Sequence, residues 1–447
     1  MDGAKAAVMS TAVPRPLLTV PDGLLLVVGM VVGAGIFKAP SIVAGNVSSG
    51  LEFALLWIAG GIASLCGALV YTELSGRFPE TGGEYRFLHR AYGGGASFVF
   101  AWSRMTVVQT GAIAAVAFVF GDYAQQILPL GGKGAALYAG LAVLALSMLN
   151  LLGTPQGKGL QKMLSSALLI ALAAIALAGV LGPQAPAEPR AAEPVAASLG
   201  LAMIFVLLTY GGWNEAAYIA GEVRNSRRNM LRILVGGIVA ITLLYLLVNF
   251  AYYRALGLEG MRGSQAVAAD VLRLSAGETG AKLIAFVVCV AALTTMNAAI
   301  ITGARASYAF GRDYSMLRYL GAWREAGSTP ANALRVQGAL TLVLVFAASF
   351  TPDGFTSMVA YTTPVFWTFF LACGVALFVF RARLGRPESF RVPLYPLVPL
   401  VFCGTCAYML YSSINYVRFA ASFGAAVLAG IVVMALGIPL YLRARRK

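Results

Sequence analysis

Apolar residues run along the chain in long stretches, and short polar segments that hold most of the charges separate them. A helix needs roughly 20 mostly apolar residues to cross a bilayer. The pattern predicts twelve membrane-spanning helices, at about 22–45, 52–76, 95–127, 135–152, 163–182, 197–221, 232–256, 265–304, 336–350, 354–380, 394–414 and 420–442.

Glycines interrupt two of these stretches, at residues 29–37 and 209–214. An unwound turn leaves backbone N–H and C=O groups unpaired, which in hydrocarbon costs several kcal/mol per group. Such a break survives where the freed groups face protein, water or a ligand. Two breaks in corresponding halves of one chain indicate a transporter binding site at mid-membrane. The alternative is that the glycines only permit close helix packing.

The positions of the breaks predict an all-α integral membrane protein with a single transport domain, residues 1–447. Each break opens a set of five spans, the first over about 20–182 and the second over about 197–381. This order matches the inverted 5+5 helix repeat of LeuT-like secondary transporters, with broken helices 1 and 6. Two extra helices, in about 394–442, stand outside the repeat.

Composition excludes a soluble protein, because 59% of the residues are hydrophobic and only 11% are charged. The net charge of +15 is a topology signal, and nucleic acid is not an expected partner. Of the 33 Lys and Arg residues, 24 fall in the termini and the loops on their side, and 7 fall on the opposite side. This bias predicts a multi-pass protein of the cell inner membrane with both termini cytoplasmic, in contact with membrane lipid.

Neither metal chemistry nor catalysis has a candidate motif. The five cysteines lie in apolar spans, and no Cys–His spacing typical of a metal site occurs. No span carries His, Asp or Cys clustered for catalysis. We therefore expect no enzyme activity, no cofactor and no metal. A channel is the other rival, but no re-entrant filter pattern is present.

The chemistry of the breaks points to a zwitterion. Gly33, Ala34 and Gly35 let a ligand approach backbone amides closely. The half-helix that restarts there presents its N-terminal amides, which suit a carboxylate. Carbonyls at the end of the other half-helix, near residues 207–210, suit an ammonium group. An α-amino acid satisfies both ends at once, although other zwitterions also qualify.

Ordered motifs along nearly the whole chain, from about Leu18, strengthen this picture. They are Gly33-Ala34-Gly35-Ile36-Phe37 with Pro40, Tyr71-Thr72-Glu73-Leu74 with Gly82-Gly83-Glu84-Tyr85, Tyr210-Gly211-Gly212-Trp213-Asn214 with Glu222 and Asn225, Asn297 with Arg305 and Arg312-Asp313, and Arg391-Val392-Pro393 with Pro396. In this order the chain resembles the amino acid–polyamine–organocation superfamily. The likeness is greatest to the L-type amino acid transporter light chains and their bacterial relatives.

The resemblance implies a substrate site on both breaks. The carboxylate would lie on Val32, Gly33, Ala34, Gly35 and Ile36, and the amino group on carbonyls around Met30, Val31, Leu208 and Thr209. Tyr210, Gly211 and Gly212 form the second break. Trp213 and Asn214 would shape the pocket for the substrate side chain.

Three departures from the family pattern matter. Leu208-Thr209 stand where relatives carry an aromatic gate, which implies a different occlusion or a bulkier substrate. Leu168 aligns with a lysine that replaces sodium in many relatives, so the coupling ion stays open. The segment 128–135 lacks the cysteine that tethers animal light chains, so no disulfide-linked heavy chain is expected.

Polar residues near the breaks are candidates for coupling and gating. Glu215 would tune proton coupling or else hydrogen-bond the unwound segment. Thr294, Thr295 and Asn297 would ligate sodium or else join helices. Glu222 and Arg227 would form an inner gate or else a solvated helix end.

Four further charged residues fall in or near spans. Lys38 is either a snorkelling surface lysine or a residue that meets substrate or ion. Glu73 with Arg77, and Arg104, are interpreted as structural.

These observations predict a secondary active transporter of amino acids that works by alternating access, as an exchanger or an ion-coupled symporter. The alternative keeps the fold and carries a polyamine or another organic cation, for which Glu215 is the candidate pocket carboxylate.

Overall fold

The computed structural model describes residues 19–78, 82–153, 158–185, 198–216, 223, 226–324, 329–388, 390–419 and 421–445. Throughout these ranges the regular elements are helices, and strand-type pairing is limited to isolated bridge residues, among them Arg324 paired with Thr329. The prediction of an all-helical chain is confirmed for this part.

The helices follow the predicted apolar stretches. They are α1 Val20–Val31, η1 Ala34–Phe37, α2 Ala39–Ala44, α3 Gly50–Arg77, α4 Glu84–Tyr92, α5 Gly94–Ser103, η2 Arg104–Val108, α6 Gln109–Ile127, α7 Gly134–Leu152, α8 Lys158–Leu181, α9 Leu199–Thr209, α10 Trp213–Ala216, α11 Ser226–Gly263, α12 Val267–Asp313, η4 Ser315–Leu317, α13 Ala331–Ala348, α14 Gly354–Leu384, α15 Leu397–Phe419 and α16 Ala421–Arg445.

Nine helices in the described ranges are long and apolar enough to cross a membrane. Three shorter apolar helices accompany them, Val20–Gly29, Leu168–Leu181 and Leu199–Thr209. Each of the twelve overlaps a different predicted span, and several extend beyond its predicted ends, as Val267–Asp313 and Ala331–Ala348 do. The structure therefore supports a multi-pass membrane protein.

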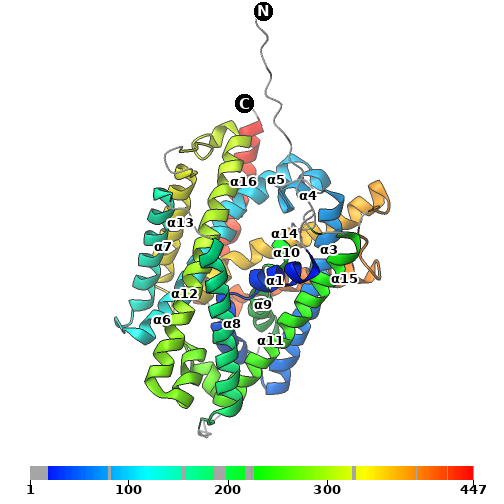
Figure 1. Cartoon of the computed structure of the whole chain (residues 1–447). Helices are drawn as coiled ribbons and strands as arrows, with labels where there is room; N and C mark the ends of the chain where they lie inside the picture. Colours follow the sequence, from blue (N-terminus) through cyan, green and yellow to red (C-terminus); the bar gives the residue numbers. More distant parts are fainter. Residues whose placement is uncertain are drawn as a thin grey trace, which may run out of the picture.

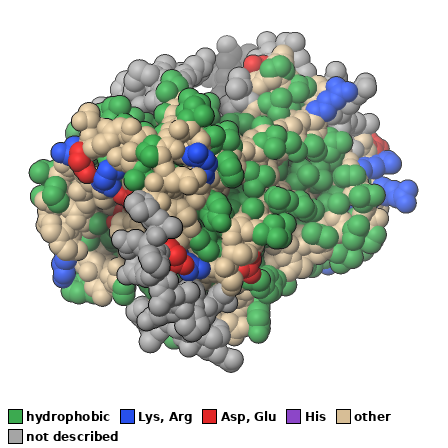
Figure 2. Space-filling model, turned by 90° about the horizontal axis from the view of Figure 1, so that it is seen from below, with side chains coloured by type: hydrophobic (Ala, Val, Ile, Leu, Met, Phe, Trp, Pro, Cys, Tyr) green, Lys and Arg blue, Asp and Glu red, His purple; other side chains and the backbone are tan. Residues whose placement is uncertain are grey.

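The outer surface is suited to lipid. On α11, Leu243, Leu247 and Phe250 are 62%, 48% and 55% exposed, and their spacing places them on one face of the helix. Figure 2 shows broad hydrophobic patches and only scattered charged side chains. In water such an apolar surface would drive association, whereas in a bilayer it is the expected lipid contact.

The interrupted helices occupy the middle of the bundle (Figure 1). Helices α1 and α9 lie between α3 and α15 on one side and α6, α8 and α12 on the other. Helix α11 packs on both α1 and α3, and α9 packs on α2 and α3. The two breaks are thus enclosed by protein, which is the condition for unwound backbone at membrane depth.

A buried carboxylate ties α3 to α14 and to the segment after it. Glu73 is fully buried, and Arg381 donates to its two carboxylate oxygens at 2.7 and 2.5 Å. Arg77 lies 3.4 Å away, and the Val392 N–H donates at 2.8 Å. The geometry agrees with the structural interpretation of Glu73, and it gives the Arg391-Val392-Pro393 motif a role in holding this junction.

One irregular turn in the third predicted span has no counterpart in the sequence prediction. Arg104–Val108 forms a π-helical turn between α5 and α6. The extra residue in such a turn rotates the side chains that follow, and such turns recur at functional sites. Arg104 pairs with Glu84 of α4 at 3.4 Å, in agreement with its structural interpretation.

Candidate functional site

The first break separates α1 from η1. Helix α1 ends at Val31, and Val32 and Gly33 are extended, with φ, ψ of −72°, 101° and −131°, −166°. The chain then re-enters helix at Ala34, and Pro40 lies in the first turn of α2, where its missing N–H costs nothing. The first N–H groups of η1 have no partner within that helix, so they face the break.

The second break separates α9 from α10. Helix α9 ends at Thr209, and Tyr210 and Gly211 continue to Gly212, whose φ is +109°. A side chain at Gly212 would be strained at that φ. An added Cβ at Gly211 would lie 2.9 Å from the Leu208 carbonyl oxygen, so this position also favours glycine. Both predicted interruptions are therefore present in the structure.

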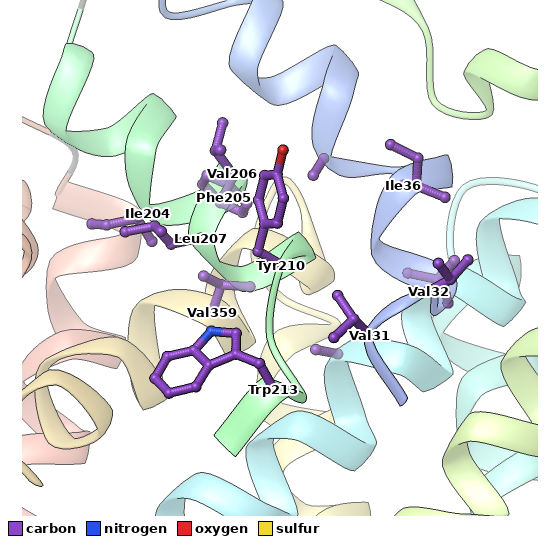
Figure 3. Packing of buried hydrophobic residues seen from close by; sticks show 14 of the residues in the cluster. Val31, Val32, Ile36, Ile204, Phe205, Val206, Leu207, Tyr210, Trp213 and Val359 are labelled. Atoms are coloured by element: carbon purple, nitrogen blue, oxygen red, sulfur yellow. The ribbon is translucent and has the colours of Figure 1, made fainter. Parts of the chain in front are cut away.

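The two breaks meet. A Cβ added to Gly35 would lie 3.3 Å from Thr209 Oγ1 and 3.4 Å from Thr209 Cα. Figure 3 shows Val31 and Val32 of the first interrupted helix close to the turn that carries Tyr210 and Trp213. Residues about 175 positions apart in sequence thus share one small region of backbone.

A tyrosine on α11 joins the two helix ends. The hydroxyl of Tyr245 is 3.1 Å from the Val31 carbonyl oxygen and 3.1 Å from the Thr209 carbonyl oxygen. One O–H has a single proton, so it cannot satisfy both carbonyls fully. These are two of the carbonyls predicted to hold an ammonium group. The sequence interpretation missed Tyr245, although a tyrosine deep in an apolar span is a signal, since its hydroxyl needs a partner.

The side chain of Tyr210 packs against α3. Its hydroxyl donates to the Trp57 carbonyl at 2.9 Å, and its ring packs against Trp57 and Tyr245 with centroids 6.2 and 5.2 Å apart. Gly60 makes room for this contact, because a Cβ there would lie 3.2 Å from the ring. The site contribution of Tyr210 is therefore its backbone.

Trp213 packs inside the bundle. Its ring lies edge-on to Tyr71 and Phe370, with centroids 5.3 and 5.5 Å away, and a Cβ at Gly67 would clash with it at 2.4 Å. Trp213 is 5% exposed. It fixes α10 against α3 and α14, and in Figure 3 its ring points away from Tyr210.

Asn214 connects the second break to α4. Its side-chain amide donates to Glu84 Oε1 at 3.2 Å, and Glu84 Oε2 lies 3.4 Å from Arg104 Nη1. The buried carboxylate of Glu84 thereby links α10 to the π turn. The sequence placed Glu84 in a family motif without a role.

The polar residues of α12 have partners that need no ion. Thr294 and Thr295 donate to carbonyls one turn earlier in their own helix, at 2.8 and 3.1 Å. The side-chain oxygen of Asn297 accepts from Asn150 of α7 at 2.7 Å. Only the Asn150–Asn297 contact matches the helix-joining alternative, because the two threonines bond within α12. The sodium-coupling alternative stays a prediction.

Several predicted positions are outside the described part of the chain. They are Glu222 and the side chains of Met30, Glu215 and Arg227. The backbone of Leu208 lies in α9, and its side chain is 42% exposed. The interpretation of Lys38 as a snorkelling surface lysine is wrong, because Lys38 is 2% exposed and faces carboxylates inside the bundle.

A charged cavity of about 150 Å³ opens at the α4 end of the bundle. Its polar lining residues are Tyr85, Arg104, Gln109, Ser307 and Asp313, and apolar residues such as Phe100 and Phe310 line the rest. The Tyr85 hydroxyl donates to Asp313 at 3.3 Å. Charged and polar groups thus border a space between α5, α6 and α12.

The breaks combine opposite partial charges within one small volume. The ends of α1 and α9 present carbonyls on either side of the Tyr245 hydroxyl, and the start of η1 presents amides. Helix C-termini favour cations and helix N-termini favour anions. The arrangement can bind a small molecule that carries one ammonium and one carboxylate, with no covalent chemistry.

The fold defines a multi-pass membrane protein in which two interrupted helices meet. The chain belongs to the amino acid permease family, whose sequence model matches residues 18–437. The predicted resemblance to that superfamily is confirmed.

Characterised relatives cover most of the chain. The Serine/threonine exchanger SteT of Bacillus subtilis is 26% identical over 424 residues, 94% of this chain and 94% of that protein. The human b(0,+)-type amino acid transporter 1 is 28% identical, over 85% of this chain and 80% of that protein. The human Large neutral amino acids transporter small subunit 2 is 27% identical, over 92% and 78%. These relatives are transporters, so the prediction of a non-enzyme is confirmed.

Proposed function

We propose that this protein carries amino acids across the cytoplasmic membrane by alternating access, as an exchanger or an ion-coupled symporter. The observation that carries the proposal is the Tyr245 hydroxyl, 3.1 Å from the carbonyl oxygens that end both interrupted helices. An ammonium has three donors, so it can bond both carbonyls where one hydroxyl cannot. The amides that open η1 would hold the carboxylate.

The transport domain would contain twelve spans, in the inverted 5+5 arrangement. The three short apolar helices count as half-spans or partly described spans of this set. The Arg- and Lys-rich side, which includes α4 and the end of α16, would face the cytoplasm. The cavity beside Arg104 then lies on the inward route.

The substrate would stabilise an occluded state by its contacts to both breaks. Each break is a hinge, because extended residues such as Val32 and Gly33 can change φ and ψ without breaking helix hydrogen bonds. The half-helices would then move against helices such as α6 and α12, which pack on each other as a continuous scaffold. No covalent step and no cofactor enter this cycle.

Uptake by the purified protein in liposomes tests the proposal. A panel of labelled amino acids, with a polyamine included, is offered with and without sodium, a proton gradient and internal amino acid. We expect saturable uptake of at least one amino acid, at least about tenfold above protein-free liposomes, a difference of about 1.4 kcal/mol in barrier height.

The conditions separate the modes of transport. Uptake that requires internal amino acid and ignores both gradients identifies an exchanger. Dependence on sodium or on pH identifies a symporter and directs attention to Thr294, Thr295 and Glu215. Uptake of the polyamine alone would contradict the assignment of the substrate.

A further inference from the structure

Lys38 is buried in a polar cluster that is separate from the backbone groups proposed to hold the substrate. Its ammonium lies 2.7 Å from Asp122 Oδ2 and 3.3 Å from Asp353 Oδ2. It also donates to Gln265 Oε1 at 2.8 Å. Lys38 is 2% exposed, and the two carboxylate side chains are 15% and 25% exposed.

The four residues come from four separate parts of the fold. Lys38 joins η1 to α2, directly after the first break. Asp122 lies near the end of α6, Gln265 connects α11 to α12, and Asp353 immediately precedes α14. The end of α6 and the connection from α11 to α12 lie at the end of the bundle away from α4 (Figure 1). One ammonium thus attaches the restarted half-helix to three neighbours.

A second contact reinforces the same attachment. The hydroxyl of Tyr123 donates to the Phe37 carbonyl at 2.8 Å and accepts from the Ala268 N–H at 3.3 Å. Tyr123 follows Asp122 in α6, and Phe37 precedes Lys38. Two consecutive residues of α6 therefore hold two consecutive residues at the end of η1.

The charges make this attachment conditional on Lys38. Two carboxylates face one ammonium in a place with little water, and a buried charge is tolerated only when it is paired. Burial raises the pKa of the Asp353 carboxyl, but the charge of Lys38 and the hydrogen bonds from Thr356 outweigh burial and lower that pKa below its usual value. Without the ammonium, the carboxylates would repel each other and draw in water.

We infer that Lys38 is a positioning residue of the transport cycle. It holds the half-helix η1–α2 against α6 and α14 while this side of the site is closed, and it releases the half-helix when this side opens. The inference rests on the proposed function, in which the half-helix moves. A static structural ion pair is the competing explanation, and breaking it would change the accessibility of the half-helix no more than breaking another ion pair at the same end of the bundle.

Accessibility of α2 to a reagent in the external medium distinguishes the two explanations. Ser41 is 6% exposed and lies one turn beyond Lys38, where its hydroxyl donates to the Lys38 carbonyl at 3.0 Å. Ser41→Cys is introduced into a chain whose five native cysteines are replaced by alanine. Intact cells are then treated with a membrane-impermeant maleimide, and inverted vesicles are treated in parallel.

Lys38→Met in this background is expected to raise the rate of labelling from outside about tenfold, because the closed state loses its tether. Asp353→Asn is expected to raise the labelling rate less, since the carboxylate of Asp122 remains and asparagine still caps α14. The matched control is Arg273→Gln. Arg273 lies at the same end of the bundle, where it pairs with Asp270 and Glu278 of α12 and donates to Gln126 of α6 at 2.9 Å. These contacts join α12 to α6 and do not involve η1 or α2. Its labelling rate is expected to stay at the level of the parent.

Unchanged labelling in Lys38→Met would overturn the inference, and so would an equal increase in Arg273→Gln. If Lys38→Met is not recovered as a folded protein, the labelling rates of Asp353→Asn and Arg273→Gln are compared instead. A faster rate in Asp353→Asn is expected, and equal rates in the two variants would overturn the inference. The labelling does not depend on the transported solute. If the parent protein carries no amino acid but the labelling difference holds, the substrate proposal fails and the role of Lys38 stands.

Discussion

Gly35→Leu is expected to abolish amino acid uptake, with a loss of at least about 100-fold, because small displacements at a site can cost that much. A Cβ alone at this position would lie 3.3 Å from Thr209 Oγ1 and 3.4 Å from Thr209 Cα. The further carbons of leucine would push the end of α9 away from η1 and cover the amides that open it. Initial uptake rates in liposomes, normalised to the amount of monodisperse protein, measure the effect.

The matched control lies in the same interrupted helix. Gly29 has open space around an added Cβ, so Gly29→Ala is expected to keep uptake within about twofold of the parent and to favour the helix slightly. Uptake near the parent level in Gly35→Leu would mean that the two breaks do not need this close approach.

Tyr245→Phe is expected to reduce uptake about tenfold, equivalent to about 1.4 kcal/mol. The change removes one hydroxyl and leaves the carbonyls of Val31 and Thr209 without their shared donor. A buried polar group without a partner costs about 1–3 kcal/mol. The two helix ends are therefore no longer held at a fixed distance from each other. Uptake rates and the thermal stability of the purified protein are measured together.

Tyr210→Phe is the control for the loss of a buried hydroxyl as such. The Tyr210 hydroxyl donates to the Trp57 carbonyl within α3, whereas that of Tyr245 meets the carbonyls that end both interrupted helices. We expect a loss of about 1 kcal/mol in stability and a smaller change in uptake than in Tyr245→Phe. Equal losses of uptake in the two variants would contradict a specific role for Tyr245.

The fold could be predicted from the sequence to a large extent, because lipid imposes simple rules. Every backbone group must be satisfied within the membrane, so long apolar stretches become helices, and glycine pairs such as Gly211-Gly212 mark where they unwind. The π turn at Arg104–Val108 could not be predicted, since no glycine or proline marks it. It depends on packing against neighbouring helices.

The sequence predicted the parts of the candidate site that consist of backbone groups at the two breaks. It did not predict the side chains that reach these groups from distant spans. Val31 and Thr209 follow from the glycine pattern, but the partner that joins them is 36 residues beyond Thr209 on α11. Lys38 has the same difficulty. Its sequence position gives two alternatives, and only the approach of Asp122, Gln265 and Asp353 in space decides between them.

The central claim is that substrate binds on the backbone of the first break, and Gly33→Ala tests it most directly. The nearest atom to an added Cβ at Gly33 is the Val31 carbonyl oxygen, 3.9 Å away, and its φ of −131° suits alanine. The substitution therefore fits the empty site and obstructs only a ligand. We predict that the melting temperature without ligand stays within about 2 °C of the parent, since no contact is lost. The affinity for the transported amino acid, measured by equilibrium binding, is predicted to fall about tenfold. An unchanged affinity would contradict the account.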